Sequence, residues 1–415
     1  MKKILFISEF DLNAQSSGCL HFLDIYTNAK PFADCTFLKI SNIYLHANAF
    51  KDSEKVAALK GRPLKCIQEN YTYYNFITST YFDHEYNYPI DLERSIIITQ
   101  IKFIATNDSN IIYEWLVEMG YDKVIVFLQE PYSIFLANSL ISKGVTLIPI
   151  VMDLPEMRVS LLNISKQTAK IINDSFTDSI KNAYAVLCAS DSGIEYLSIF
   201  TNKKKLFPAF PVFRRKLNQR LPKKINLKTG IKIALAGQVY AKESLDKFLY
   251  LINEYTKNNE LNIQFDLYGD SPAQQTFLAM IKSHNINKNL KIGIFDYLPH
   301  IELQEIFEKN YHIGYVPYPK DASLVNTIKY SFPSKFVSYI EAGLIPIYHG
   351  PLNSSVCRIL DQFKLSCLVI DIDESTSSLE CLFKFIQYMP SESYVEMSKK
   401  FTQNSLAASL KIVVK

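Results

Sequence analysis

Short apolar runs alternate with segments of helical apolar spacing along this chain, and that alternation constrains the fold more than any other feature. In the second half, apolar runs at 231–236, 263–268, 290–294, 313–317, 345–348 and 367–370 alternate with helical segments at 244–255, 272–283, 301–309, 334–342, 354–363 and 377–388. In the first half, similar runs occupy 3–8, 123–128, 145–151 and 183–188, with a helical segment at 19–29. Strands alternating with helices form parallel sheets covered on both faces, so the pattern predicts an α/β protein with doubly wound sheets.

The alternation stops between Pro208 and Leu227, where prolines and basic residues replace it. A chain of 415 residues suits two domains, so we interpret this break as a linker. We expect a first domain at 1–207, a linker at 208–230, a second domain at 231–390, and a C-terminal segment at 391–415 that packs back on the first domain. Two Rossmann-like doubly wound domains facing each other across a cleft would bind ligands at the carboxyl ends of their strands.

Composition narrows the class of protein. The chain is 48% hydrophobic and 21% charged, which is typical of a globular protein. Its seven cysteines are scattered singly, and neither they nor the histidines have the spacing of a metal site, so we predict reduced cysteines and no metal. No apolar run approaches the roughly 18–20 residues of a membrane span, and the first run is too short for a signal peptide. We therefore expect a cytoplasmic protein.

Charge is unevenly distributed. Ten basic residues and no acidic residue lie between Lys203 and Lys228; subtracting these ten charges from the net charge of +4 leaves −6 for the rest of the chain. Phe207, Phe210 and Phe213 interleave with the basic residues, a pattern that suits an anionic lipid surface. A solvated linker is the alternative. No nucleic-acid-binding motif accompanies the segment, so we do not expect nucleic acid as a partner.

Glycine is scarce, with twelve in the chain, so a glycine directly after a predicted strand is informative. Gly237 follows the run at 231–236, and Gly269 follows the run at 263–268. A glycine at such a turn lets a phosphate approach the backbone at a helix N-terminus. The chain has no G-x-G-x-x-G and no G-x-x-x-x-G-K-[ST] motif, which disfavours dinucleotide dehydrogenases and P-loop enzymes.

The segment 331–347 contains the most specific motif. Pro333 and Ser334 begin a predicted helix, and Lys335 lies in its first turn. A cation there opposes the helix dipole and needs a compensating anion. A diphosphate held by the helix amides and by Lys335 would supply that anion.

This segment resembles the donor-binding motif of family-4-type glycosyltransferases with the GT-B fold, in which Pro-Ser-Lys begins a helix that ends in small-Gly-x-Pro. The turns around Gly237 and Gly269, and the segment 297–303, are similar to other motifs of that family. In the first domain, Gln129-Glu130-Pro131 resembles a His-Glu-Pro turn, and Ser16-Ser17-Gly18 resembles a glycine loop that faces the donor diphosphate. The residues that the resemblance implies for donor binding are Gly18, Gly237, Gln238, Lys242, Gly269, Tyr297, Leu298, Pro333, Ser334, Lys335 and Ser338.

Several positions depart from the family pattern. Its paired glutamates are replaced by Tyr330 and Ser338, its phosphate-loop arginine by Gln238, and the histidine of its His-Glu-Pro turn by Gln129. Serine can still hydrogen-bond a ribose, whereas glutamine loses bidentate anion binding.

The candidate catalytic residues are Glu130, Asp153 and Lys335. Glu130 either orients an acceptor hydroxyl or only caps a helix. Asp153 follows the run at 145–151, where an acceptor or a base would lie. Glu9, Asp11 and His21 are weaker candidates, with His21 read as a helix-face residue.

The hypothesis from the sequence is a glycosyltransferase that moves a sugar from a nucleotide-sugar donor to a glycan or lipid-linked acceptor, as in bacterial envelope polysaccharide synthesis. The resemblance implies a retaining, metal-independent reaction in which the nucleotide-diphosphate sugar is a substrate and no cofactor is needed. Attachment to the inner face of the plasma membrane through 203–228 would place it beside a lipid-linked acceptor. The alternatives are a nucleotide-sugar epimerase on the same fold and a catalytically silent partner subunit.

Overall fold

The computed structural model describes residues 1–9, 17–41, 63–68, 71–77, 90–156, 164–320, 324–371 and 376–415. The chain forms two compact units. The first comprises Met1–Phe210 and Leu406–Lys415, and the second comprises Pro211–Ser405.

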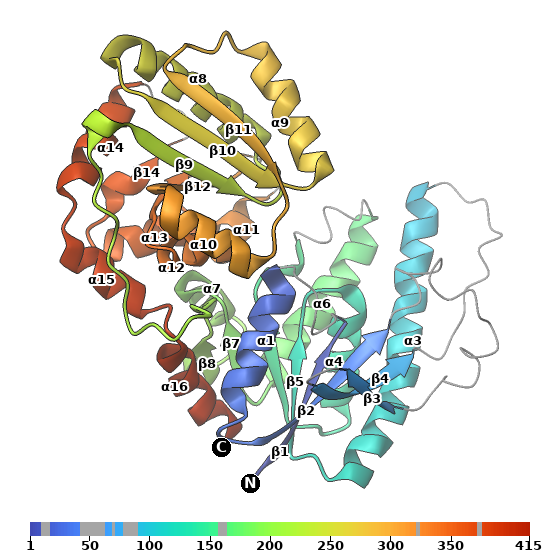
Figure 1. The fold of residues 1–415 in the computed structure, drawn as a ribbon. Helices are drawn as coiled ribbons and strands as arrows, with labels where there is room; N and C mark the ends of the chain where they lie inside the picture. Colours follow the sequence, from blue (N-terminus) through green and yellow to red (C-terminus); the bar gives the residue numbers. More distant parts are fainter. Residues whose placement is uncertain are drawn as a thin grey trace. The chain divides into compact units, whose positions relative to one another are not determined.

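The first unit is built on one sheet whose strand order is β3-β4-β2-β1-β5-β6-β7-β8 (Figure 1). Its strands are β1 (Lys3–Ser8), β2 (Asp34–Ser41), β3 (Leu64–Gln68), β4 (Tyr71–Ile77), β5 (Lys123–Phe127), β6 (Leu147–Val151), β7 (Val186–Cys188) and β8 (Leu206–Pro208). All described strand pairs are parallel except β3 with β4, which is antiparallel at the sheet edge. The predicted parallel sheet is therefore correct apart from this pair.

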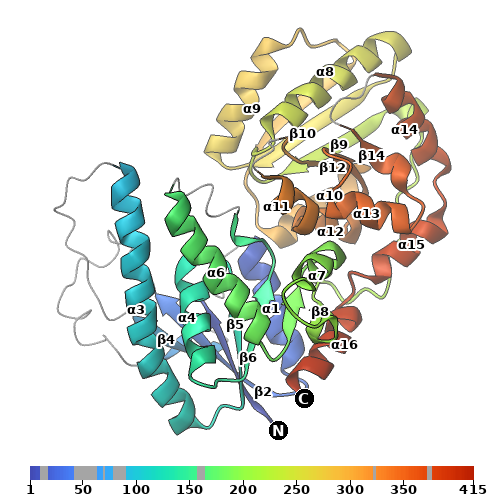
Figure 2. The same cartoon turned by 180° about the vertical axis from the view of Figure 1, so that it is seen from behind.

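Helices cover both faces of the first sheet. They are α1 (Ser17–Ala29), α3 (Ile90–Met119), α4 (Pro131–Ser142), α6 (Lys166–Asn182) and α7 (Asp191–Leu197), with the end of α16 (Gln403–Val414). Helices α3, α4 and α6 lie side by side over one face, which is in front in Figure 2, and α1 lies on the opposite face. The Nζ of Lys123 at the start of β5 donates to the carbonyl of Val413, which fixes α16 to this unit.

The second unit contains a six-stranded sheet with the order β11-β10-β9-β12-β13-β14, in which every described pair is parallel. The strands are β9 (Ile231–Ala236), β10 (Ile263–Gly269), β11 (Leu290–Asp296), β12 (Ile313–Pro317), β13 (Ile345–His349) and β14 (Val369–Ile370). The helices are α8 (Lys242–Asn259), α9 (Ser271–Ser283), α10 (His300–Asn310), α11 (Val325–Tyr330), α12 (Ser334–Glu341), α13 (Ser355–Gln362), α14 (Thr376–Tyr388) and α15 (Ser391–Lys399).

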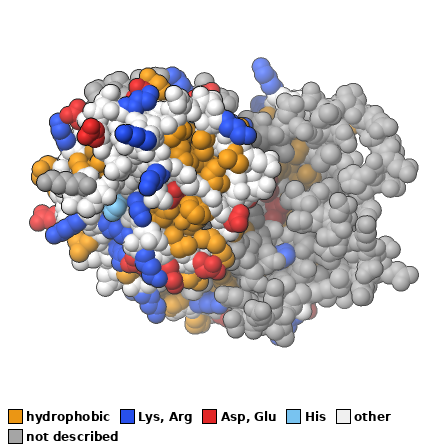
Figure 3. Space-filling model, turned by 45° about the horizontal axis from the view of Figure 1, so that its top comes forward, with side chains coloured by type: hydrophobic (Ala, Val, Ile, Leu, Met, Phe, Trp, Pro, Cys, Tyr) orange, Lys and Arg blue, Asp and Glu red, His pale blue; other side chains and the backbone are white. Residues whose placement is uncertain are grey.

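Aromatic side chains build the core on both faces of this second sheet. On one face, Phe248 of α8 and Phe277 of α9 pack against Phe265 of β10. On the other face, Phe307 of α10 packs against Tyr268 of the same strand. Side chains alternate between the faces of a strand, so each apolar run buries residues on both sides, as expected of a doubly wound sheet. The outer surface of this unit mixes apolar groups with charges of both signs (Figure 3).

Candidate functional site

The order of the second sheet reverses direction between β9 and β12, because the chain moves from β9 outward to β11 and then returns to the other side of β9. In open α/β sheets, ligands bind outside the carboxyl ends of the strands at such a switch point. The segment after β9 contains Gly237 and Tyr240, and β12 ends at Pro317. The Tyr240 hydroxyl donates to the Pro317 carbonyl at 3.0 Å, so it joins the two segments at this point.

Lys335 places a charged side chain at the switch point of the second sheet. Its Nζ is buried and has no hydrogen-bond partner among the residues that the structure describes. The aromatic ring of Tyr240 lies over it, with 5.0 Å between Nζ and the ring centroid. Burial lowers the pKa of Lys335 from 10.5 to about 8. A buried ammonium without hydrogen bonds is costly, and an anion at hydrogen-bond distance would offset that cost.

Helix α12 brings Lys335 to the switch point. The helix begins after Pro333, its N-cap residue, and has no acidic residue in its first turn. Tyr339, one turn after Lys335, accepts a hydrogen bond on its hydroxyl from the backbone N–H of Ala236, the last residue of β9. A Cβ at Gly314 of β12 would lie 2.1 Å from the Tyr339 ring, so only glycine leaves room for this tyrosine. These contacts fix the helix against the two strands that flank the switch point.

The two predicted phosphate-loop glycines have different roles. Gly237 has a φ of +85°, a conformation that favours glycine, and a Cβ there would meet nothing within 4 Å. Its backbone is therefore open to a close approach. Gly269 instead allows α9 to approach the strand closely, because a Cβ at this position would lie 2.9 Å from the Ala273 Cβ of α9. Gly269 is required for packing of the helix on the strand.

The other predicted donor residues lie on the same unit, after strands or on α12. Gln238 and Lys242 are exposed on either side of Tyr240. Tyr297 is 50% exposed between β11 and α10, and Leu298 beside it is half-buried. Pro333, Ser334 and Ser338 are also half-buried; the Ser338 carbonyl accepts a hydrogen bond from the Gln304 side chain at 2.9 Å.

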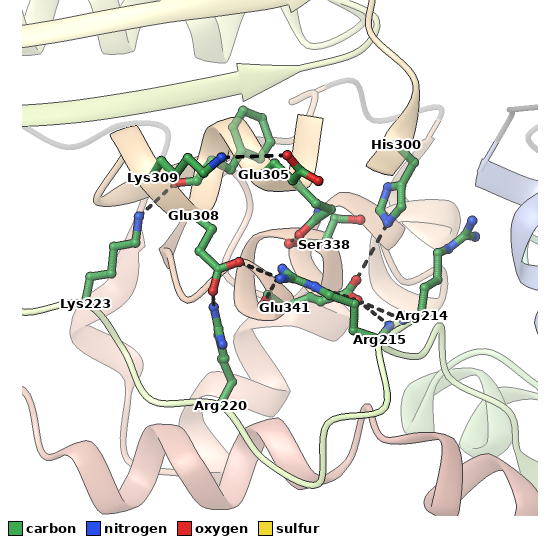
Figure 4. Close-up of polar contacts among 12 residues, drawn as sticks. Arg214, Arg215, Arg220, Lys223, His300, Glu305, Glu308, Lys309, Ser338 and Glu341 are labelled. Atoms are coloured by element: carbon green, nitrogen blue, oxygen red, sulfur yellow. Dashed lines mark hydrogen bonds and ion pairs between the residues drawn. The ribbon is translucent and has the colours of Figure 1, made fainter. Parts of the chain in front are cut away.

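A network of charged groups between α12 and the segment after Pro211 has no counterpart among the sequence predictions (Figure 4). The Glu341 carboxylate, at the end of α12, accepts the backbone N–H groups of Arg214 and Arg215 at 2.9 and 2.8 Å. Glu308 of α10 pairs with both Arg215 and Arg220, and these guanidinium groups lower its pKa to about 2. Such partners are distant in sequence, so no local pattern identifies them.

This network and the packing of the phenylalanines correct the picture of the basic segment. Phe210 and Phe213 are 4% and 0% exposed, so they belong to the core and not to a lipid-facing surface. Apolar burial outweighs the local basic context that suggested an exposed face. The Lys223 ammonium is also used internally, because it donates to the Phe307 and Tyr311 carbonyls at the end of α10. His300 is the first residue of α10, and its Nε2 lies 3.7 Å from the Glu341 Oε2.

The first sheet has its switch point between β1 and β5, where carboxylates gather. Glu9 follows β1, and its Oε1 accepts the backbone N–H of Ser133 in the first turn of α4 at 3.1 Å. Glu130 is the N-cap residue of α4 and forms a capping box with Ser133. Beside it, the buried Gln129 Oε1 has no hydrogen-bond partner within the described ranges.

The remaining candidates of the first domain lie after β6 and on α1. Asp153 follows β6, and it is half-buried. Gly18 lies in the first turn of α1, and His21 is buried on the same helix. Asp11 and Ser16 lie outside the described residues.

Comparison with known proteins finds no protein family whose model matches this sequence, and no curated protein matches it. Solved structures do match in fold. The trehalose-6-phosphate protein of E. coli bound with UDP-2-fluoro glucose has a TM-score of 0.59 at 9% identity, over 100% of this chain and 97% of that chain. Sucrose-phosphate synthase of Thermosynechococcus elongatus has a TM-score of 0.59 at 11% identity, over 98% of this chain and 97% of that chain.

A Listeria monocytogenes protein assigned as a UDP-N-acetylglucosamine 2-epimerase matches at a TM-score of 0.50 and 9% identity, over 98% of this chain and 94% of that chain. At such identities these likenesses show the fold alone, which is GT-B: two Rossmann-like domains. The fold is thus shared with nucleotide-sugar glycosyltransferases and epimerases.

The described residues contain neither a membrane-spanning helix nor a cluster of metal-ligating side chains. None of the helices there is long and apolar enough to cross a membrane. No group of three or more histidine, cysteine, aspartate or glutamate residues in those ranges could hold a metal ion.

Proposed function

We propose that this protein transfers a sugar from a nucleoside-diphosphate-sugar donor to a hydroxyl group of an acceptor, and that the second unit binds the donor. The observation that carries the proposal is the buried Lys335 ammonium, without a hydrogen-bond partner among the described residues, at the switch point of a Rossmann-like sheet. A diphosphate would neutralise that charge and would accept hydrogen bonds from the first amides of α12.

The chemistry follows from the charge that develops during transfer. The bond between the anomeric carbon and the diphosphate oxygen breaks, and the nucleoside diphosphate leaves with an additional negative charge. Lys335, the α12 amides and the open backbone at Gly237 would stabilise that charge. Protein cations acting in this way would make the reaction independent of a metal, and we expect retention of configuration, as the resemblance to family-4-type enzymes implies.

The acceptor is proposed to bind to the first unit. Glu9, Glu130 and Asp153 all follow strands of its sheet, and carboxylates there suit the orientation of an acceptor hydroxyl. We propose a glycan or lipid-linked acceptor, as in envelope polysaccharide synthesis. The E. coli structure was solved with UDP-2-fluoro glucose, so UDP and UDP-glucose are the first donors to test.

Calorimetry with UDP and a panel of nucleotide sugars tests the proposal. Lys335→Ala should weaken binding by about 2–4 kcal/mol, because it removes a charge-assisted phosphate contact. Lys329→Ala is the matched control, since the Lys329 Nζ also lies 5.0 Å from a tyrosine ring centroid, that of Tyr330, but on an exposed side chain. Equal binding by wild type and Lys335→Ala would refute the donor site.

Activity assays then separate the alternatives. Transfer of sugar to an acceptor supports the transferase, and interconversion of the donor without an acceptor identifies an epimerase. Donor binding without either reaction identifies a silent partner subunit.

The same proposal includes weak, reversible attachment to an anionic membrane. Exposed cations remain on the basic segment at Lys203, Lys204, Lys216 and Lys224. Each is worth about 1 kcal/mol near an anionic surface. Sedimentation with anionic vesicles at low salt, lost when these four lysines become serine, would support the attachment; sedimentation independent of lipid charge would refute it.

A further inference from the structure

The aromatic ring of Tyr240 lies between solvent and the Lys335 ammonium. An anionic ligand would have to reach that buried ammonium. The Lys335 Nζ has almost no exposed surface, whereas the Tyr240 side chain above it is 46% exposed. The ring centroid lies 5.0 Å from Nζ, so the attraction is that of a cation for an aromatic face. A phosphate contact requires an oxygen at hydrogen-bond distance from Nζ, which an aromatic ring does not provide.

The side chain of Tyr240 contacts Pro317 and Tyr318 as well as Lys335. Its hydroxyl donates to the Pro317 carbonyl, and its ring meets Tyr318 edge-on, with centroids 6.4 Å apart and an interplanar angle of 82°. The surroundings of Tyr318 are fixed, because its backbone N–H donates to the His349 carbonyl and its carbonyl accepts from Ser244. The segment that carries Tyr240 begins at Gly237, whose open side would allow the backbone to adjust.

We propose that Tyr240 gates the anion site: its ring covers Lys335 in the free protein and moves aside when a diphosphate reaches the ammonium. The hydroxyl-to-Pro317 bond latches the closed position, and the ring shields the ammonium from water and small monovalent anions. A diphosphate offers oxygens that accept hydrogen bonds from the Lys335 ammonium and from the released Tyr240 hydroxyl. Tyr240 therefore controls the access of the anion to Lys335. This inference rests on the proposed function for its diphosphate ligand, but the closed state can be tested without any ligand.

The first experiment measures the rate at which an amine-reactive reagent labels individual lysines at about pH 8 in the full-length protein, by peptide mass spectrometry. A matched control pair exists on α8, where the Lys247 Nζ lies 5.6 Å from the centroid of Tyr250, which is 48% exposed. Because the lowered pKa of Lys335 by itself speeds labelling, rates are measured across a pH series and compared per neutral amine. On that basis we expect Lys335 to be labelled at least about tenfold more slowly than Lys247, as for groups that react only after a local opening.

Substitutions then identify the gate. Tyr240→Phe removes the latch but keeps the ring, and should raise the Lys335 labelling rate several-fold; Tyr240→Ala should bring it close to the Lys247 rate. Tyr250→Phe should leave Lys335 unchanged. Thermal unfolding of each variant shows whether the fold is kept. The gate is refuted if Lys335 is labelled as fast per neutral amine as Lys247 in wild type, or if a folded Tyr240→Ala variant leaves the Lys335 rate unchanged.

The second experiment uses inorganic pyrophosphate as the probe, and it separates the gate from the proposed function. Pyrophosphate should protect Lys335 from labelling in wild type and should bind faster to Tyr240→Phe. If pyrophosphate protects Lys335 equally fast in wild type and in both Tyr240 variants, the gate is wrong and the anion site stands. If it protects Lys335 in none of them, the proposed anion site fails, and the ligand-free labelling rates still decide whether Tyr240 covers Lys335.

Discussion

The helix N-termini at the two switch points of this protein carry side chains of opposite charge. In the first unit, Glu9 receives the N–H of Ser133 at the start of α4, and Glu130 caps that helix. In the second unit, the start of α12 has no acidic residue in its first turn and carries Lys335 instead. The first helix N-terminus is already satisfied by a carboxylate, whereas the second is combined with an additional cation.

This difference supports the proposal that the two units bind different substrates. A helix N-terminus attracts anions, and a carboxylate from the protein uses that attraction internally. Where a lysine stands in its place, the anion has to come from a ligand. The comparison therefore supports the proposal that the second unit binds the anionic donor and the first unit binds a hydroxyl-bearing acceptor.

Reversing the charge at the second switch point should have the largest effect. Lys335→Glu places a carboxylate against the incoming diphosphate, and pyrophosphate affinity should fall by more than about 100-fold, since like charges in contact cost several kcal/mol. Lys329→Glu is the control and should change affinity little. Calorimetry measures the pyrophosphate affinity of both variants. If a folded Lys335→Glu variant still binds pyrophosphate, the proposal that the second unit binds the anion through Lys335 is wrong.

Pyrophosphate affinity should depend on pH, because it depends on the positive charge of Lys335. Because burial lowers the pKa of Lys335 to about 8, the free protein loses this cation as pH rises through that value, and affinity should fall by up to about tenfold per pH unit above it. Lys335→Arg should abolish this fall, because arginine stays charged.

The free energy of unfolding should change with pH in the opposite direction from the affinity. Between pH 8 and the ordinary lysine pKa of 10.5, the unfolded chain binds more protons, so the unfolding free energy contributed by Lys335 rises.

A smaller effect is expected at the first switch point. Glu9→Gln removes the negative charge at the α4 N-terminus and should lower the free energy of unfolding by about 0.3–1 kcal/mol. Denaturant unfolding measures this loss, with the exposed Glu114→Gln as control. Pyrophosphate affinity should not change; a clear loss of affinity would mean that the first unit also binds the anion.

The smallest effect should follow Ser338→Glu, which adds the carboxylate that the resembled family has on this helix. Ser338 is half-buried one turn after Lys335, so a longer side chain has room to reach a ribose. UDP affinity should be unchanged or slightly higher by calorimetry. Much weaker UDP binding by a folded variant would indicate that this pocket accommodates another donor geometry.

The sequence predicted the second unit more fully than the first. The apolar runs at Ile231–Ala236 and Ile313–Pro317 coincide with β9 and β12, because a glycine or a proline ends each run. No pattern predicted the antiparallel β3–β4 pair or the helix α3. In α3, buried polar residues interrupt the apolar stripe: Asp108 and Ser109 are both 0% exposed, and Asp108 accepts a hydrogen bond from Tyr132.

The sequence suggested candidate site residues where a local motif contained them. Lys335 was identified because proline, serine and lysine open a helix together. The role of Tyr240 was not, because an aromatic residue in a loop has no spacing rule that indicates which side chain it will cover. The Glu341 network requires tertiary contacts between residues more than 120 positions apart.

The contact between Gly314 and Tyr339 has a consequence for evolution. The tyrosine ring fills the space where any other residue at 314 would place its Cβ, and its hydroxyl holds the end of β9. Neither residue can be replaced alone without a clash or a void. In related sequences the two positions should therefore covary: glycine at 314 should accompany an aromatic residue at 339, and a larger residue at 314 should accompany a smaller one at 339.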